Sequence, residues 1–405
     1  MSDRYPGGLI RKTPPTITPP VDGEGGSAPG IWTLEQASYY TKTGVWPQKV
    51  IPRELYSWGD GGSGQLGLNA TANTSSPDQV GALTTWSKIG AGNSSSVAIK
   101  TDGTMWSWGS GNSGRLGQNS IVYTSSPVQI GALTTWSKVA VGNAHNLALK
   151  TDGTMWSWGS GTNGQLGVGT AINVSSPVQI GLLTTWAQVA AGNSFSAAIK
   201  TDGTMWSWGS DSVGRLGQNS TVYTSSPVQI GALTTWSQVA LGNAHSLALK
   251  TDGTMWSWGY GATGQLGVGA VIDVSSPVQI GALTTWSQVA AGNSHSLALK
   301  TDGTMWSWGE GSFGAVGLNN QISYSSPVQV GALNTWAQVA SGNNFSVALK
   351  TDGTMWSWGY GSNGRLGVGT NGINVSSPVQ IGASTTWLLL PKMPGANHVL
   401  ALSTL

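Results

Sequence analysis

Hydrophobic and polar positions recur along most of this chain with a period of 50 residues. Each unit holds four short segments, MWSWG, SSPVQI, TTWSQVAA and HSLALK, which alternate apolar and polar residues and are separated by Gly, Pro, Asn and Asp. Period-2 alternation between turn residues predicts β-strands, and four strands per unit are typical of one propeller blade. The string TDGTMWSWG begins at Thr101, Thr151, Thr201, Thr251, Thr301 and Thr351, and a degenerate copy, PRELYSWG, ends at Gly59.

The two ends of the repeat region complement each other. The first unit starts at the MWSWG-type strand, residues 55–59, and lacks the two strands that should precede it in a blade. Residues 387–390 and 398–402 near the C-terminus match those missing strands. A solenoid is the alternative for any tandem repeat, but it would need polar capping units, which the sequence lacks. We therefore predict an all-β, seven-bladed β-propeller, closed by strands from both termini.

Residues 1–50 differ from the repeats. They are rich in Pro and Gly up to Gly30 and cannot bury a core, which predicts an extended N-terminal arm. The segment from Thr33 to Gly44 could open a short helix. We predict two parts, an arm over residues 1–50 and a propeller over residues 51–405, with Trp32 and Trp46 as candidate anchor residues on the arm.

The amino-acid composition excludes several classes of partner and chemistry. Charged residues make up 8% of the chain, the net charge is +2 and the lysines are spread one per repeat, so no basic stripe predicts nucleic-acid binding. The absence of cysteine excludes disulfides, thiolate catalysis and Cys-based zinc sites. Neither a signal peptide nor a membrane span is predicted, because no apolar run is long enough.

Two resemblances add expectations. The pattern HSLALKTDGTMWSWG, for example from His295, followed by a glycine-rich loop, resembles the RCC1 repeat over residues 51–405. This resemblance implies a seven-bladed propeller. The best-known member of that family is a chromatin-bound nucleotide exchange factor for a small GTPase, and other members are partner-binding platforms. The basic tail and the insertion within a blade that would match exchange activity are missing here, so the resemblance implies fold more than activity.

The second resemblance lies in the arm. GGLIRKTPPTITPP and SAPGIWTLEQASYYTKTGVWP, within residues 7–47, are similar to segments of virion and tail-fibre proteins of tailed phages. This resemblance implies a structural protein of the virion, of the tail-fibre, adhesin or capsid-decoration type, assembled in the host cytoplasm. The arm would then bind other virion proteins, and a host receptor, a glycan or a second copy of the chain would be further partners. The alternative is an intracellular RCC1-like interaction platform or guanine-nucleotide exchange factor.

Two recurring motifs resemble a cofactor site and a metal site, but the surrounding sequence argues against both. Gly109 to Gly114 fits GxGxxG after a strand, but the chain continues into RLGQNS instead of a helix and the motif recurs in other units. No cofactor is therefore predicted. One histidine position per blade holds His145, His245, His295 and His398, but Ser or Phe replaces it elsewhere and no short-range pair has metal-ligand spacing, so no metal is predicted. Without a catalytic triad or paired carboxylates, we predict that the chain is not an enzyme.

The repeats diverge mainly between MWSWG and SSPVQI. Binding residues commonly lie on variable loops held by a rigid frame, which makes these loops the candidate partner-binding site. Solvated loop residues without a partner are the alternative. The candidate contacts are Asp60, Arg115, Tyr123, Arg215, Tyr223, Tyr260, Glu310, Phe313, Tyr324, Tyr360 and Arg365.

Overall fold

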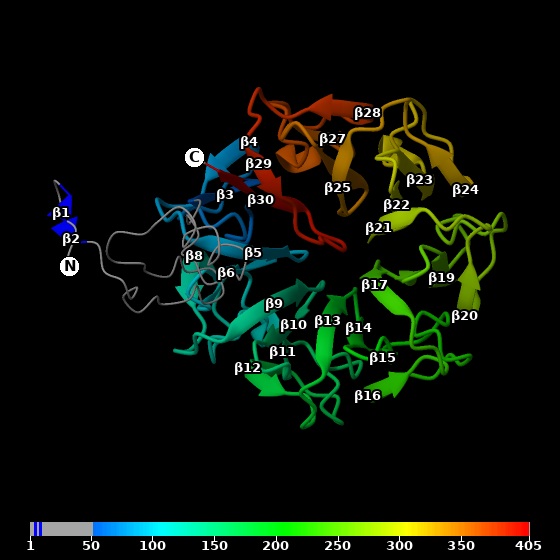
Figure 1. Ribbon diagram of the computed structural model, residues 1–405, viewed down its shortest axis with the longest axis horizontal. Helices are drawn as coiled ribbons and strands as arrows, with labels where there is room; N and C mark the ends of the chain where they lie inside the picture. The colour runs from blue at the N-terminus through cyan, green and yellow to red at the C-terminus, as the bar shows by residue number, and fades with distance from the viewer. Residues whose placement is uncertain (1–3, 6–7, 10–51, 405) are drawn as a thin grey trace.

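The computed structural model describes residues 4–5, 8–9 and 52–404. Over residues 52–404 it shows seven four-stranded antiparallel sheets arranged as blades around a central channel, which confirms the predicted seven-bladed propeller (Figure 1). The short strands β1 (Arg4–Tyr5) and β2 (Gly8–Leu9) pair with each other. The predicted helix and the anchor residues Trp32 and Trp46 lie outside the described residues.

Six blades each come from one continuous segment, and we number them 1 to 6 in chain order. Their inner strands are β5 (Trp86–Ala91), β9 (Trp136–Val141), β13 (Trp186–Ala191), β17 (Trp236–Leu241), β21 (Trp286–Ala291) and β25 (Trp336–Ser341). Their second strands are β6 (Ser95–Lys100), β10 (His145–Lys150), β14 (Phe195–Lys200), β18 (His245–Lys250), β22 (His295–Lys300) and β26 (Phe345–Lys350).

The outer half of each blade follows the same scheme. The third strands are β7 (Met105–Gly109), β11 (Met155–Gly159), β15 (Met205–Gly209), β19 (Met255–Gly259), β23 (Met305–Gly309) and β27 (Met355–Gly359). The outer strands are β8 (Thr124–Gln129), β12 (Val174–Gln179), β16 (Thr224–Gln229), β20 (Val274–Gln279), β24 (Tyr324–Gln329) and β28 (Val375–Gln380). Short 3-10 turns lie at η1 (Asn112–Gly114), η2 (Ser312–Gly314) and η3 (Ser362–Gly364). Every outer strand carries a proline at its fourth residue, as Pro127 does in β8.

The seventh blade, called the closing blade, joins the two ends of the propeller. Its strands run in the order β29 (Trp387–Leu389), β30 (His398–Thr404), β3 (Arg53–Gly59) and β4 (Thr74–Gln79). Strands β3 and β30 pair over seven residues, from Arg53 with Thr404 to Gly59 with His398. The prediction that each end supplies two strands is confirmed, and Figure 1 shows the blue and red strands side by side.

Tryptophans of the third strands fill the space between neighbouring blades. Trp108 is fully buried, and its Nε1 donates to the backbone oxygen of Gln65 in the preceding blade at 2.9 Å. Gly67 packs against this ring at φ +73°, where an added Cβ would lie 2.7 Å from Trp108 Nε1. The glycine is therefore required both for its backbone conformation and for the close approach of the indole. The same contact recurs from blade to blade, so identical sequence yields identical spacing.

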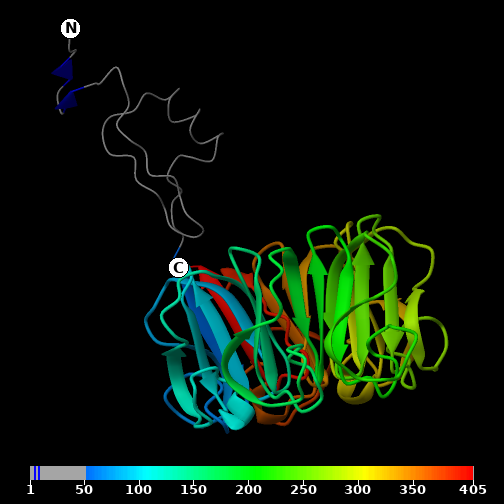
Figure 2. The ribbon, with the colours of Figure 1, turned by 90° about the horizontal axis from the view of Figure 1, so that it is seen from below.

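The TDG strings form the tight turns predicted for them. Asp102 accepts hydrogen bonds from the backbone nitrogen of Thr104 at 2.9 Å and from its hydroxyl at 2.7 Å, and Gly103 has φ +75°. These turns lie at one end of the blades. The loops between third and outer strands, together with the Gly-Asn loops between inner and second strands, lie at the other end because antiparallel strands alternate in direction. We call that end the loop face; Figure 2 shows the blades from the side.

Candidate functional site: the loop face

The eleven candidate contacts predicted from sequence lie on the loops of this face or at the first residue of an outer strand. They are spread over the closing blade and blades 1, 3, 4, 5 and 6. The structure brings four of them together, namely Asp60, Phe313, Tyr360 and Arg365. None of the other seven stacks on these four residues or forms a hydrogen bond with them.

Phe313, Tyr360 and Arg365 form the group that we call the aromatic-arginine cluster. The ring centroids of Phe313 and Tyr360 are 4.6 Å apart, and Arg365 Cζ lies 4.7 Å from the Tyr360 centroid. These residues come from the loops of blades 5 and 6, which are neighbours in the ring. Stacking of this kind combines a large apolar contact with a cation over a π face.

Hydrogen bonds to neighbouring loop residues fix the position of the Arg365 guanidinium. Its Nη1 donates to the backbone oxygen of Asn343 and to the side-chain oxygen of Asn397, both at 3.1 Å, and its Nε donates to the backbone oxygen of Ser362 at 2.9 Å. Burial lowers the pKa of Arg365, while the charges of Tyr360 and Asp60 act in the opposite direction. The guanidinium, only 4% exposed, is therefore a fixed support for the tyrosine ring.

Phe313 has an unusual backbone. Its φ is +60°, the left-handed region that bulky residues rarely adopt. The equivalent residues Ser113 and Asn363 have φ values of +61°, so the loop imposes this conformation on small polar residues elsewhere in the ring. An aromatic residue in this position stores strain of about 1–3 kcal/mol.

Within each blade, the residue in the glycine-rich loop depends on the residue at the histidine position. Blades with His145, His245 or His398 carry a glutamine in the glycine-rich loop, and the blade with His295 carries Ala315. The three arginines, Arg115, Arg215 and Arg365, lie in the blades that hold Ser95, Phe195 and Phe345. Arg215 Cζ lies 5.6 Å from the Phe195 centroid. In the part of the chain that the structure describes, no blade has both a loop arginine and a buried histidine at these two positions.

Histidines connect blades. His145 Nε2 lies 2.8 Å from Ser196 Oγ of the next blade, and Ser196 in turn donates to the backbone oxygen of Gln165. His398 makes the same contact with Ser96 across the closing blade at 2.6 Å. Burial lowers the pKa of His145, His245 and His398 to about 3 and that of His295 to about 4. Among the residues that the structure describes, no three His, Asp or Glu side chains gather where they could hold a metal ion.

A belt of asparagines surrounds the channel mouth on the loop face. The Nδ2 of Asn143 donates to Oδ1 of Asn193 at 2.6 Å, Asn343 donates to Asn397 at 3.1 Å, and Asn397 donates to Asn93 at 2.6 Å. The last two contacts cross into and out of the closing blade. Sequence reasoning missed this belt, although a Gly-Asn pair in six units and Ala396-Asn397 in the closing blade were the available signal. The seven members are Asn93, Asn143, Asn193, Asn243, Asn293, Asn343 and Asn397.

Aliphatic and tyrosine side chains are exposed where the loops lead into the outer strands. Tyr123 and Tyr223 are each 59% exposed, whereas Tyr324 is partly buried and its hydroxyl receives a hydrogen bond from Asn320 at 2.9 Å. We call the exposed residues the apolar rim: Ile121, Val122, Tyr123, Ile172, Val222, Tyr223, Val271, Ile272, Ile322 and Ile373. The closing blade has Thr71, Ala72 and Asn73 in the corresponding segment. Each of the six regular blades contributes at least one of these residues, and contiguous exposed apolar patches are typical of interaction sites.

Asp211 is a further residue that sequence reasoning missed. It replaces a glycine of the repeat, it is 1% exposed, and its Oδ1 accepts the backbone N–H of Leu216 at 3.1 Å. Burial raises its pKa. The signal was its departure from the glycine found at the equivalent position, for example Gly111.

Comparison with known families and structures agrees with this architecture. The model of the RCC1-like domain matches residues 174–404, more than half of the chain. The chain belongs to the RCC1-like family. Models of the regulator of chromosome condensation (RCC1) repeat match residues 54–99 and 102–149, and a second form matches residues 86–115 and 136–165. The predicted RCC1 resemblance is thus confirmed.

Similar solved structures include human and yeast proteins. Human WBSCR16 is 21% identical, with a TM-score of 0.79 over 87% of this chain and 99% of that one. Yeast RCC1 (Prp20), solved with Kap60, is 21% identical, with a TM-score of 0.78 over 88% of this chain and 89% of that one. Prp20p of Saccharomyces cerevisiae, studied for binding to Gsp1p and histones, is 22% identical, with a TM-score of 0.77 over 88% of this chain and 92% of that one. No curated protein sequence matches the chain.

These comparisons correct the functional interpretation of the arm. The prediction of a phage virion component, and of a virion location, is wrong, because the family is RCC1-like and the similar structures are human and yeast proteins. The resemblance of residues 7–47 to phage proteins is not supported by any of them. Nothing in the described residues forms a helix that could span a membrane. The partners predicted for residues 1–50 stay predictions.

Proposed function

We propose that this RCC1-like chain is a protein-interaction platform that binds a partner protein through its loop face. The aromatic-arginine cluster carries this inference. Tyrosine and arginine dominate the energetics of protein interfaces, and a rigid aromatic anchor loses little conformational entropy on binding. Arg365 is fixed before any partner arrives, because three hydrogen bonds hold its guanidinium.

Two further observations support binding over catalysis. The strained backbone of Phe313 presents an aromatic ring where the other units have serine, asparagine, threonine or valine, and strain of this kind gathers at functional positions. The apolar rim lies on the same face and adds exposed aliphatic surface around the cluster. The remaining parts of the repeats are nearly identical, as expected for a frame that positions variable loops.

The experiment compares two tyrosines at equivalent positions. A photocrosslinking residue replaces Tyr360 in the cluster or Tyr260 in blade 4, and each bait is exposed to extract of the source cells. We expect the bait altered at Tyr360 to join covalently to a defined protein at a yield about 5-fold higher than the bait altered at Tyr260. Equal crosslinking from the two positions would contradict a role for the cluster.

A substitution tests the same site without a crosslinker. Phe313→Ser places in the loop the residue that blade 1 carries at Ser113 with φ +61°, so folding should be unaffected. Binding of the crosslinked partner should weaken by about 10-fold, which corresponds to about 1.4 kcal/mol. If that partner is a small GTPase, its rate of nucleotide release with and without the chain distinguishes exchange activity from binding alone.

A further inference from the structure

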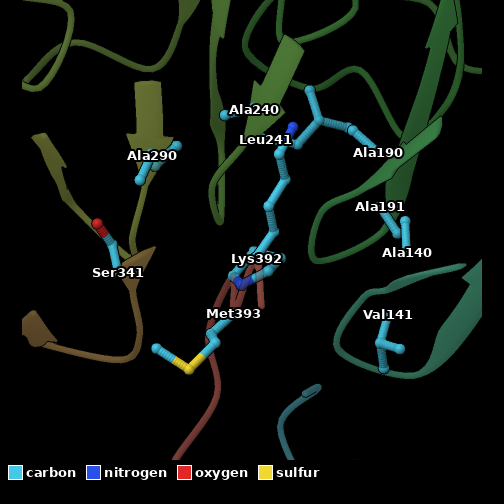
Figure 3. Close-up of a pocket in the computed structure, with 12 residues that line it drawn as sticks. Ala140, Val141, Ala190, Ala191, Ala240, Leu241, Ala290, Ser341, Lys392 and Met393 are labelled. Carbon is cyan, nitrogen blue, oxygen red and sulfur yellow. The ribbon is translucent and has the colours of Figure 1, made fainter. Parts of the chain in front are cut away.

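A segment of the closing blade narrows the central channel. Strand β29 ends at Leu389, one residue earlier than predicted, because Pro391 has no N–H to continue the ladder. The next residue, Lys392, lies inside the channel, as Figure 3 shows, and its Nζ donates to the backbone oxygen of Val239 in blade 4 at 2.6 Å. The hollow left at this level measures about 20 Å³, so it has room for little more than a water molecule.

A larger groove lies between blades 4 and 5. It measures about 320 Å³, comparable with the roughly 300–1,000 Å³ of small-ligand sites. It borders the end of the outer strand of blade 4, the linker between the two blades and the outer strand of blade 5. Among the described residues, no charged side chain lines it. Its apolar side chains are Val268, Ile280, Leu283, Trp286, Trp306 and Pro327.

The groove is open because a glycine replaces an asparagine. Gly269 occupies the position of Asn219 in blade 3, and the backbone nitrogen of each donates to the outer strand of the next blade. Asn219 Oδ1 accepts a hydrogen bond from Ser276 Oγ at 3.4 Å. Since Gly269 has no side chain, the equivalent Ser326 borders open groove instead. The groove therefore belongs to particular blades and is not a property of every repeat.

A second junction has the same composition. Between blades 2 and 3 the equivalent residues are Val168, Gly169, Ile180, Leu183, Trp186, Trp206 and Pro227. At four other junctions an asparagine replaces the glycine. Between blade 6 and the closing blade the glycine is kept, but Tyr56 and Ser384 replace the second tryptophan and the leucine. The ring therefore offers two matching apolar grooves.

The polar groups beside the groove are mostly paired within the protein. Gln279 Nε2 donates to the backbone oxygen of Gly281 at 3.0 Å, and Trp306 Nε1 donates to Thr304 Oγ1 at 3.0 Å. The groove therefore suits an uncharged occupant that has few hydrogen-bond donors. A proline-rich peptide meets this demand, because proline lacks an N–H and the polyproline II helix is formed before it binds an aromatic-lined groove.

We propose that Thr13 to Pro20 of the N-terminal arm, with the sequence TPPTITPP, binds in one of these two grooves of its own chain. The segment lies outside the described residues, and its sequence holds two Pro-Pro pairs and no charge. The arm joins the ring at Arg53, whose backbone nitrogen donates to the backbone oxygen of Thr84 at 2.8 Å. Thr84 lies in the linker between the closing blade and blade 1, which is equivalent to the linker that borders the groove.

The arm is long enough to reach either groove. Thirty-three positions separate Pro20 from Arg53. An extended chain spans about 3.3 Å per position, so the reach of about 110 Å exceeds the radius of gyration of about 20 Å expected for a domain of this size. A tether of this kind raises the effective concentration of the segment at the ring. The grooves do not include the aromatic-arginine cluster, so this inference goes beyond the partner binding proposed above.

Photocrosslinking within the full-length chain tests this contact. A photoreactive residue replaces Ile17, between the two Pro-Pro pairs, and crosslinked peptides are identified by mass spectrometry. We expect about 5-fold more crosslinks to the peptides that contain Leu183 and Leu283 than to those that contain Leu133 and Leu233, at junctions filled by asparagine. Equal crosslinking to all four junctions would overturn the proposal. Products at twice the mass of the chain would place the segment on a second copy and overturn the assignment to the same chain.

Filling the grooves gives a matched test. Gly169→Asn combined with Gly269→Asn installs the residue that blade 3 carries at Asn219 with φ +53°, so the ring should stay folded. We expect crosslinks to both grooves to fall by about 10-fold. Gly369→Asn, at the junction that lacks the second tryptophan, is the control and should leave them unchanged. Unchanged crosslinking in the double variant, or an equal fall in the control, would contradict the proposal.

A change in the arm tests the same contact without altering the ring. Alanine in place of Pro14, Pro15, Pro19 and Pro20 keeps the length of the arm but removes the preformed polyproline II helix. Crosslinking from position 17 to the two grooves should then fall by about 10-fold as well. Crosslinking that persists at the original yield would show that the proline pairs do not bind there.

Discussion

The closing blade and the six regular blades have the same strand order but are held together differently. In blade 1, Lys100 Nζ lies 3.7 Å from the centroid of Trp106, and Trp106 packs edge-to-face on Trp86. In the closing blade, Tyr56 occupies the position of Trp106, and its ring centroid lies 5.2 Å from that of Trp387. Trp387 pairs across the strands with Ser403, whereas Trp86 of blade 1 pairs with Lys100. The cation is absent from this position.

Regular blades and the closing blade also differ in how far apart in the sequence their paired strands lie. A regular blade forms from one continuous stretch of chain, so its strands pair locally. The closing blade forms only when residues about 340 positions apart meet, and loop closure then makes its pairing the last and most costly step. It lacks the lysine–tryptophan contact of the regular blades, but its ladder between β3 and β30 has seven residue pairs, compared with five between β6 and β7.

The largest effect should follow from removing residues 398–404. This deletion takes away β30 with its buried residues Val399 to Leu402, leaves β3 with one open edge and uncovers the core residues that packed on them, such as Leu55 and Trp58. We expect a loss of more than about 5 kcal/mol in unfolding free energy, because large buried side chains each contribute about 2–5 kcal/mol. Chemical denaturation followed by tryptophan fluorescence measures it. A loss below about 2 kcal/mol would mean that the ring does not depend on its closure.

An intermediate effect should follow from acid. The four buried histidines have folded-state pKa values of about 3 to 4, below the value of 6.5 in the unfolded chain. Between these values the unfolded state binds more protons, so stability is complete above about pH 6.5 and falls as the pH drops. Each histidine should contribute a slope of up to about 1.4 kcal/mol per pH unit.

His398→Phe sharpens the comparison between blades. Phenylalanine occupies the equivalent position in Phe195 and Phe345, so the substitution is compatible with the blade. The variant should lose about a quarter of the acid slope in urea titrations between pH 4 and pH 6, as His245→Phe should in a regular blade. An unchanged slope in both variants would show that these imidazoles do not titrate on unfolding.

The smallest effect should come from making the closing blade regular. Ser403→Lys restores the lysine that pairs with the inner-strand tryptophan in other blades, and should raise the unfolding free energy by less than about 1 kcal/mol through a cation-π contact. Ser96→Lys, at a fully buried position, serves as a destabilising control. A stability decrease in Ser403→Lys would show that the closing blade cannot accept the contact of its neighbours.

The sequence predicted the fold well because one pattern, repeated with a fixed period, specifies strands, turns and their number. Ring closure followed from matching residues 398–402 to the second strands. The aromatic-arginine cluster was foreseen only as separate residues, since neither Phe313 nor Tyr360 indicates that two loops 47 residues apart converge. Lys392 lies in a segment that the repeat does not template, so its reach to Val239 could not be read from the pattern. The phage interpretation rested mainly on a short resemblance within residues 7–47, outside the repeats that specify the fold.

The proline in each outer strand has a consequence for colloidal stability. Seven outer strands present seven sheet edges to solvent, and with 8% charged residues the chain has little electrostatic repulsion to keep copies apart. A proline cannot donate to an added strand, so an incoming chain would find the hydrogen-bonding ladder interrupted at the same place on every blade. Low charge is therefore compatible with a monodisperse solution, and substituting these prolines should promote assembly without altering the ring.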